Sequence, residues 1–207
     1  MSCGAVILAA GESRRMGRLK QTLPWGDRTV VEAAVDAALD AADVSEVVVV
    51  LGHEAQAVAS ALTSRPRPRM RVVVNADYHL GMLSSVKTGV RALADGIEAF
   101  LVAPADQAGV SAEDYRLVVQ AYRRARPQVD IVIPTCRGRG GHPTLFAADV
   151  RREVLDLPYD GRGLLDLIAR HEGRVLRVEL DRPGMVADLD TAEDYERALE
   201  IRKTRIF

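Results

Sequence analysis

The sequence lacks several features that mark particular classes of protein. It has only two cysteines, Cys3 and Cys136, which lie far apart and form no CxxC motif, so a reducing cytosol is favoured over a disulfide framework. No apolar run approaches the ~18 residues that a membrane-spanning helix needs. The short apolar run near the N-terminus is followed, not preceded, by arginines, unlike the core of a signal peptide.

The sequence also has little net charge. Its formal charge of −1 provides no basic field for nucleic acid. The arginine-rich stretch 65–71 contains no aromatic residues between its cations, so we expect it to form a solvated loop. Together these absences predict a cytoplasmic protein with neither a membrane partner nor a nucleic-acid partner.

What the sequence has is a regular alternation of short β-branched runs with longer amphipathic stretches. The expected strands are 5–10, 46–51, 71–75, 99–103, 130–134 and 175–180. The expected helices are 29–42, 54–63, 83–93, 112–126, 162–171 and 191–203. Such alternation is typical of parallel sheets with right-handed crossovers. We therefore expect an α/β fold, with one domain over residues 1–207, a doubly wound, mostly parallel, Rossmann-like sheet, and a loop-rich excursion around 135–163.

The strongest functional signal is a loop directly after the first strand, at residues 8–26. Gly11 and Gly17 free the backbone to approach a ligand, and exposed backbone N–H groups can form a nest for phosphate oxygens. The loop carries four cations, which are Arg14, Arg15, Arg18 and Lys20. The P-loop pattern GxxxxGK[ST] and the dinucleotide pattern GxGxxG are both absent. The loop therefore predicts a polyphosphate site of another kind.

Carboxylates occur at two further places where a strand-like run ends or a helix begins. Asp106 follows the fourth expected strand, where it is either a ligand for Mg²⁺, which prefers one or two carboxylates with phosphates and waters, or simply the start of a helix. Near the C-terminus, Asp188 or Asp190 is a candidate for a second metal carboxylate. Thr191 and Asp194 have the spacing of a helix N-cap.

The loop 8–26 resembles a known signature. Its residues, LAAGESRRMGRLKQTLPWG, match the pattern LAAGxSxRMGxxKxxLP of the MobA-like NTP transferases, and the chain is most similar to the molybdenum cofactor cytidylyltransferases of that group. The resemblance implies that Arg15 and Lys20 hold a triphosphate cradled by the backbone of residues 10–17. Relatives with LAGG at this place are guanylyltransferases, so Ala10 favours cytosine over guanine.

Two middle segments resemble motifs of the same family. Residues 75–85 are similar to N-x-x-[WY]-x-x-GM-x-x-S, in which Gly81 permits a tight turn and Ser84 or Ser85 caps or opens the next helix near the base and ribose. Asp106 begins DQA where the family has DQP, so the carboxylate is retained and Ala108 replaces a proline.

Two later segments also resemble the family. Residues 134–146 are similar to its GHP element on the acceptor side, where Arg137 and Arg139 can pair with an acceptor phosphate. In the same element, His142 bonds the acceptor, carries a proton or has only a structural role. ADLDTAED near the C-terminus is similar to D-x-DTPED, with Ala192 in place of proline.

These motifs give a full set of candidate site residues. The catalytic candidates are Arg15, Lys20 and Asp106, and the metal candidates are Asp106 and Asp190. The nucleotide-binding candidates are Leu8, Ala9, Ala10, Gly11, Ser13, Gly17, Asn75, Gly81 and Ser84. The acceptor-binding candidates are Arg137, Arg139 and His142.

The resemblance implies a magnesium-dependent transfer of CMP from CTP to a molybdopterin-type acceptor, with release of pyrophosphate. It also implies a possible transient contact with a molybdoenzyme or its chaperone. Three alternatives stay open. One is a guanylyl- or cytidylyltransferase acting on another phosphorylated acceptor, such as a sugar or polyol phosphate. The second is a non-catalytic nucleotide-binding accessory protein. The third, a nicotinamide-dependent oxidoreductase, is disfavoured by the missing dinucleotide pattern.

Overall fold

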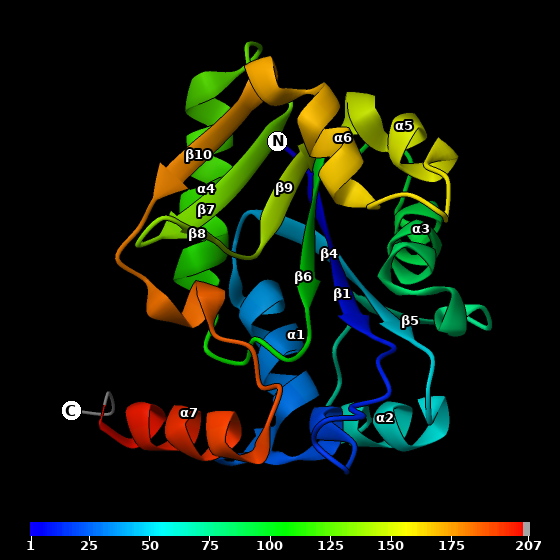
Figure 1. Ribbon diagram of the computed structural model, residues 1–207, viewed down its shortest axis with the longest axis vertical. Helices are drawn as coiled ribbons and strands as arrows, with labels where there is room; N and C mark the ends of the chain where they lie inside the picture. The colour runs from blue at the N-terminus through cyan, green and yellow to red at the C-terminus, as the bar shows by residue number, and fades with distance from the viewer. Residues whose placement is uncertain (205–207) are drawn as a thin grey trace.

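A mixed eight-stranded sheet forms the centre of the computed structural model, which describes residues 1–204 (Figure 1). Across the sheet its strands are β10 (Val175–Glu179), β7 (Ile131–Cys136), β9 (Thr144–Ala147), β6 (Ala99–Pro104), β1 (Cys3–Ala9), β4 (Val44–Leu51) and β5 (Met70–Val74), with β8 (Arg139–Gly140) paired to β7. Neighbours along this path are parallel except where β9 joins β6 and β7. A separate hairpin consists of β2 (Pro24–Trp25) and β3 (Arg28–Thr29).

Helices cover both faces of the sheet. The helices on one face are α1 (Val30–Asp40), α2 (Ala55–Leu62) and α4 (Ala112–Ala125), and those on the other are α3 (Met82–Ala92), α5 (Arg151–Asp156) and α6 (Leu164–Arg170). The last helix, α7 (Ala192–Thr204), lies beyond the sheet (Figure 1). Short 3-10 turns are η1 (Lys20–Thr22), η2 (Tyr78–Leu80), η3 (Ala148–Val150), η4 (Glu172–Arg174) and η5 (Pro183–Val186). Over the described residues, no helix combines the length and apolar character that crossing a membrane requires.

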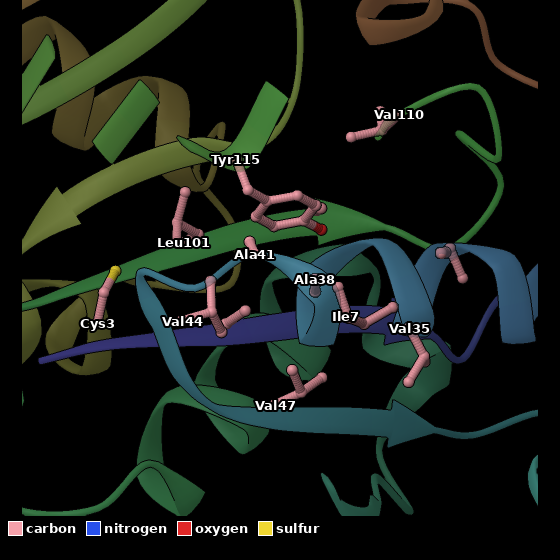
Figure 2. Packing of buried hydrophobic residues seen from close by; sticks show 14 of the residues in the cluster. Cys3, Ile7, Val35, Ala38, Ala41, Val44, Val47, Leu101, Val110 and Tyr115 are labelled. Atoms are coloured by element: carbon pink, nitrogen blue, oxygen red, sulfur yellow. The ribbon is translucent and has the colours of Figure 1, made fainter. Parts of the chain in front are cut away.

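Two apolar cores follow from the alternation of side chains along the central strands. In β1, Ala5 and Ile7 pack with α1, α2 and α4, whereas Val6 packs with α3, α5 and α6. Figure 2 shows the first core, in which Tyr115 of α4 and Val35 of α1 belong to the same cluster as Ile7. A strand buried on both faces has no polar alternation. The predicted doubly wound, mostly parallel α/β fold is confirmed, and every expected strand and helix is present within two residues.

The segment 135–163 differs from the expectation of a loop-rich excursion. It supplies β9, which is inserted antiparallel between β6 and β7 with Leu145 opposite both Leu101 and Val132. The ring of Phe146 stacks on that of Phe100, with centroids 5.4 Å apart. The segment also contains α5. The strand escaped prediction because all four of its residues are buried, so it shows neither the length nor the alternation by which a strand is recognised.

A third, smaller core joins α7 to the loop after β1. It consists of Met16, Leu23, Trp25, Val30, Ala108, Leu189 and Tyr195. The Tyr195 hydroxyl donates to the Pro24 carbonyl, and the Leu189 amide donates to the Asp106 carbonyl at 3.2 Å. These contacts fix the chain just before α7 against the carboxyl end of β6.

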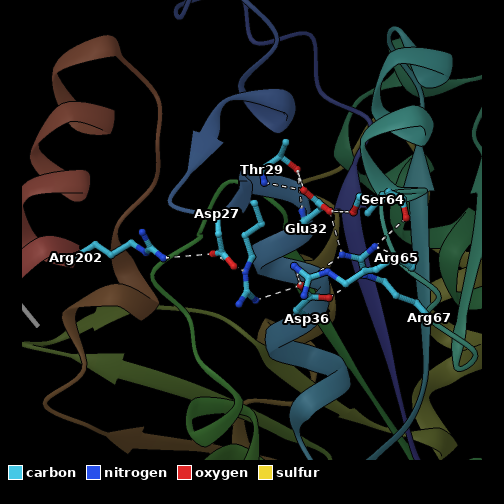
Figure 3. A network of polar contacts seen from close by, with 10 residues as sticks. Asp27, Thr29, Glu32, Asp36, Ser64, Arg65, Arg67 and Arg202 are labelled. Atoms are coloured by element: carbon cyan, nitrogen blue, oxygen red, sulfur yellow. Dashed lines mark hydrogen bonds and ion pairs between the residues drawn. The ribbon is translucent and has the colours of Figure 1, made fainter. Parts of the chain in front are cut away.

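The arginine-rich stretch 65–71 is also not the solvated loop that was expected. The side chain of Arg67 is only 2% exposed and donates to Asp36 (2.8 Å) and Glu32 (3.2 Å) on α1 (Figure 3). Arg65 pairs with Asp36 at 3.2 Å, and Arg71 pairs with Glu46 at 2.6 Å. The stretch is therefore fastened to its own domain through ion pairs.

Glu32 ties this network to the start of α1. Its carboxylate accepts from the backbone and hydroxyl of Thr29 in a capping box, and from Ser64. Burial by itself would raise the pKa of Glu32, but hydrogen bonds from Ser64, Thr29 and Arg67 lower the pKa from 4.5 to about 2. The stability that this carboxylate contributes is therefore complete above pH 4.5 and decreases as the pH falls toward 2.

Replacing Arg67 with methionine tests the network. The substitution leaves two carboxylates in a site where their side chains are 6% and 10% exposed, so we expect a loss of about 3 kcal/mol in the free energy of unfolding, measured by urea denaturation. Arg124→Met, at an exposed position on α4, is the matched control and should change it by no more than about 0.5 kcal/mol. Equal effects of the two substitutions would contradict a stabilising role of the network.

Candidate functional site

A cavity of about 500 Å³ lies at the carboxyl ends of β1 and β6, the edge where open α/β sheets bind ligands. In Figure 1 this is the lower end of the sheet, toward which both strands point. The end of β1 and the following loop contribute Leu8, Ala10, Gly11, Glu12, Ser13, Arg14, Arg15, Lys20 and Gln21. The remaining lining residues are Tyr78, His79, Gly81, Met82, Ser85, Pro104, Ala105, Asp106 and Asp190.

The loop after β1 is held open by two polar side chains. Gln21 is buried and donates to the carbonyls of Gly11 (2.9 Å) and Ala9 (3.4 Å). Ser13 donates to the Gln21 side-chain oxygen (3.2 Å) and accepts from the Lys20 amide (3.1 Å). Ser13 itself has a positive φ of 53°, and its carbonyl accepts from the amides of Met16 and Gly17. The loop thus has a defined shape before any ligand binds.

Lys20 is the cation in the cavity that contacts both carboxylates. Its ammonium donates to Asp106 and lies 3.4 Å from Asp190, and its side chain is 14% exposed. Arg15 pairs with the other oxygen of Asp190 at 3.0 Å but is largely exposed. Residues predicted from three separate motifs of the sequence therefore meet in one place.

The carboxylates are suited to a divalent cation. Oδ1 of Asp106 is buried and has no hydrogen-bond partner, although a buried acceptor normally has one. Asp190 approaches the same ammonium as Asp106. Among residues 1–204 no cluster of three or more acidic, histidine or cysteine side chains forms a complete metal site. A site of one or two carboxylates is nevertheless what Mg²⁺ uses when phosphates and waters supply its other ligands.

The opposite wall of the cavity is the turn between β5 and α3. Asn75 is buried and donates to the hydroxyls of Ser84 (2.8 Å) and Ser85 (3.0 Å), so it fixes this turn from behind. Ser85 lines the cavity, whereas Asn75 and Ser84 do not. Ser84 and Ser85 lie in the first turn of α3, as expected of residues that open the helix, but neither caps it: the N-cap is Gly81, with φ of 96° and no side-chain cap.

Some predicted nucleotide-binding residues lie beside the cavity instead of lining it. Ala9 is almost fully buried in the sheet, and Gly17 has a positive φ of 69° in the turn closed by Ser13. Sequence reasoning missed Gly52, where an added Cβ would lie 2.8 Å from Ala10 and 2.7 Å from Tyr78. A glycine after a strand was the available signal for this close approach.

A second cavity, of about 690 Å³, adjoins the first and shares Gly81 and Met82 with it. Its walls are mostly apolar and include Leu83, Val86, Ile133, Phe146, Leu164, Leu165 and Ile168. Arg162 and Arg177 also line it, but each is already paired with a carboxylate, Arg162 with Asp166 and Arg177 with Glu172. The second cavity is therefore mostly apolar, and carboxylates engage the two arginines in its wall.

His142 lines the second cavity in a defined tautomer. Its Nδ1 lies 3.3 Å from the Val102 carbonyl, which can only accept, so Nδ1 carries the proton and Nε2 offers a lone pair. Burial lowers the pKa of His142 below its ordinary value of 6.5, which keeps the ring neutral. The side chain can thus accept a hydrogen bond from a ligand.

The three predicted acceptor-binding residues are not brought together. Arg137 and Arg139 lie in and beside the turn between β7 and β8 and line a third cavity, of about 450 Å³. Arg139 donates to the Val186 carbonyl at 3.3 Å. Asp190 lines both this cavity and the first one. Asp190 therefore separates the two arginines from the loop that carries Lys20.

The neutral state of His142 has a consequence for stability. Between its lowered folded-state pKa and 6.5, the unfolded chain binds more protons than the folded chain, so the free energy of unfolding decreases as the pH falls through this window. We expect His142→Gln to lose less stability than the wild type between pH 7.5 and pH 5.5, in urea titrations at both values. His79→Gln, at an exposed position, should retain the wild-type pH dependence.

Gln21→Leu tests whether the loop is preformed. Leucine keeps much of the volume but leaves the Gly11 and Ala9 carbonyls without their donor, so the loop loses its fixed shape. We expect the affinity for a nucleoside triphosphate with a divalent cation, measured by calorimetry, to fall by roughly 10–100-fold. Gln56→Leu, exposed on α2, is the control. Wild-type affinity in Gln21→Leu would show that the side chain does not shape the binding loop.

Comparisons with known proteins agree with a nucleotide site in this part of the chain. The chain matches the MobA-like NTP transferase domain over residues 5–175. A protein of Paenarthrobacter nicotinovorans named nicotine blue oxidoreductase is 33% identical over 199 residues, which cover 94% of this chain and 95% of that one. The molybdenum cofactor cytidylyltransferase of Escherichia coli (strain K12) is 25% identical over 195 residues, with 94% of each chain covered.

Solved structures agree with this result. A nucleotidyl transferase from Methanothermobacter thermautotroptrophicus has a TM-score of 0.80 at 30% identity, covering 97% of this chain and 98% of that one. Rv0371C of Mycobacterium tuberculosis H37Rv, solved as a complex with manganese, has a TM-score of 0.76 at 26% identity, covering 97% and 99%. Since the domain match includes the loop after β1, Asp106 and the acceptor-side segment, the chain belongs to the MobA-like NTP transferase family.

Proposed function

We propose that this nucleotidyltransferase transfers CMP from CTP to a molybdopterin-type acceptor and releases pyrophosphate. The observation that carries the proposal is the meeting of Lys20, Asp106 and Asp190 in a cavity built from a small-residue loop. This arrangement supplies a cation for phosphates and carboxylates for a metal at the edge of the sheet where ligands bind.

The reaction is an in-line displacement at the α-phosphorus of the nucleotide. An oxygen of the acceptor phosphate forms the new bond to phosphorus, the bond to the bridging oxygen of pyrophosphate breaks, and pyrophosphate leaves with that electron pair. Lys20 and Arg15 stabilise the charge that develops on the leaving group. No covalent enzyme intermediate is required, so positioning and charge neutralisation by the protein account for most of the rate.

Asp106 and Asp190 are the proposed holders of Mg²⁺. A bound divalent cation neutralises charge on the α-phosphate and orients it. The free Oδ1 of Asp106 is the first ligand on this proposal, and Asp190 is the second. The manganese complex of the relative Rv0371C supports a divalent cation in this family.

The second cavity is the proposed place for the ring system of the acceptor. Its mostly apolar walls offer packing for a ring, and His142 offers one hydrogen-bond acceptor to it. The acceptor phosphate would then lie toward the nucleotide, near the shared residues Gly81 and Met82. Arg137 and Arg139 line a different cavity from His142, and Asp190 also lines that cavity. We therefore do not assign the two arginines to the ring system of the acceptor.

Cytosine is the proposed base because Ala10 lines the nucleotide cavity at the position that differs between the two kinds of relative. The cytidylyltransferase of E. coli supports this choice. We also propose a cytoplasmic location, which the two free cysteines favour, and a transient contact with a molybdoenzyme or its chaperone.

A pyrophosphate-release assay tests the function. Purified protein is incubated with Mg²⁺, reduced molybdenum-loaded molybdopterin, and CTP or GTP. We expect release with CTP, and about 10²–10³-fold less in Asp106→Ala, because the proposed metal ligand is lost. Asp95→Ala, at a fully exposed position, is the control and should keep wild-type activity.

Other outcomes of this assay point to the alternatives. Release with GTP alone would contradict the role of Ala10 but keep the reaction. Nucleotide binding without release would refute the molybdopterin acceptor and favour a sugar or polyol phosphate, or a non-catalytic accessory protein. Equal activity of Asp106→Ala and the wild type would refute the proposed metal site.

A second candidate function is that of an oxidoreductase, favoured by the name of the 33% identical relative from Paenarthrobacter nicotinovorans. The absent dinucleotide pattern and the convergent carboxylates argue against it. Titration with NADH and NADPH, followed by nicotinamide fluorescence, decides the matter. Tight binding of either nucleotide, together with no pyrophosphate release, would establish this second function in place of the first.

A further inference from the structure

One buried cation belongs to none of the cavities and ion pairs described so far. Lys87 on α3 is only 4% exposed, and none of the ion pairs among residues 1–204 includes it. An ammonium removed from water is costly unless other groups replace its hydration. Its position therefore requires specific partners.

Both partners of Lys87 lie in the segment 157–163, which connects α5 to α6. Its ammonium donates to the Leu157 carbonyl and lies 4.3 Å from the centroid of the Tyr159 ring. A charged donor strengthens a hydrogen bond to a carbonyl, and a ring face attracts a cation. The single side chain thus holds the segment at two points two residues apart.

The held segment is a wall of the second cavity. Tyr159, Gly161, Arg162 and Gly163 line that cavity, although Tyr159 is itself 47% exposed. The other end of the segment is fastened separately, because Asp166 accepts from the backbone (2.7 Å) and the side chain (2.8 Å) of Arg162. At the other end, the Leu157 side chain is buried in the apolar core and its amide donates to the Val154 carbonyl at 3.4 Å, while Lys87 is the cation that bonds the Leu157 carbonyl.

The opposite end of α3 borders the nucleotide. Met82 begins the helix and lines both cavities, and Lys87 lies about one and a half turns further along the same helix. A single rigid helix therefore connects the border between the two cavities with the outer wall of the second.

We propose that Lys87 is a positioning residue for the acceptor: it fixes the segment 157–163 as the wall against which the acceptor binds. This inference rests on the proposed function for the identity of the acceptor. Lys87 itself contacts neither substrate, because it does not line either cavity and acts through Leu157 and Tyr159.

Two variants test the proposal. Lys87→Met keeps the length of the side chain and removes the charge, and Tyr159→Leu removes the ring at a half-exposed position where folding is not at risk. Arg91→Met, which removes an exposed cation one turn further along α3, is the control. Hydrogen exchange of residues 157–163 is measured in each protein without substrate. Steady-state kinetics vary molybdopterin at saturating CTP, and then CTP at saturating molybdopterin.

We expect faster exchange of residues 157–163 in both variants, together with a roughly tenfold higher KM for molybdopterin. The KM for CTP and kcat should stay within about twofold of the wild type, since the nucleotide cavity is unchanged. Exchange at the wild-type rate would overturn the proposal, and so would faster exchange with an unchanged KM for molybdopterin. A parallel rise in both KM values would also overturn it, because that is the effect of general destabilisation.

Failure of the proposed function gives a different result. A wild-type protein that releases no pyrophosphate would refute molybdopterin as acceptor. The exchange of residues 157–163 in Lys87→Met would still decide whether Lys87 holds the wall, because it is read without any substrate.

Discussion

The sharing of one ammonium by two carboxylates is the interaction on which the candidate site depends. Lys20 bonds Asp106 and lies 3.4 Å from Asp190, although these residues are 86 and 170 positions away from it along the chain. Without the cation, two carboxylates that approach the same point would repel each other. The same cation is the natural partner of a phosphate. The free protein thus keeps its carboxylates together by an interaction that an arriving polyphosphate and metal can replace.

The fold brings these charged groups together through backbone and apolar contacts of the residues beside them. Leu189 is bonded to the backbone of Asp106 and buried in the small core with Trp25 and Tyr195. The next helix then begins at the capping box of Thr191 and Asp194, as the spacing of these two residues predicted. Asp190 is therefore held on both sides. The same segment also closes over the acceptor-side strands, because the Met185 carbonyl accepts from the amide of His142 at 2.9 Å.

The parts of the site that follow strand ends could be predicted from the sequence. An apolar run predicts a parallel strand, and a loop at the carboxyl end of such a strand can contact a ligand. Lys20 and Asp106 were chosen on this ground, and in the structure both line one cavity. The strand β9 could not be predicted, because four buried residues carry no periodicity. Gln21 was not predicted as a site residue, and Asn75 was predicted to bind the nucleotide but lies behind the cavity. The sequence does not distinguish an amide side chain that contacts a ligand from one that bonds backbone or hydroxyl groups.

The sequence by itself determined the order of strands and helices, the two-sided burial of the central strands and the clustering of cations and glycines after the first strand. These are local properties, set by side-chain periodicity and backbone freedom. Only the tertiary structure decided that His142 faces the second cavity, that Arg137 and Arg139 lie beyond Asp190, and that the segment 135–163 contributes a strand to the middle of the sheet. The physical reason is that such placements depend on contacts between residues distant in the chain, and burial and hydrogen bonding decide them only when the whole sheet has assembled.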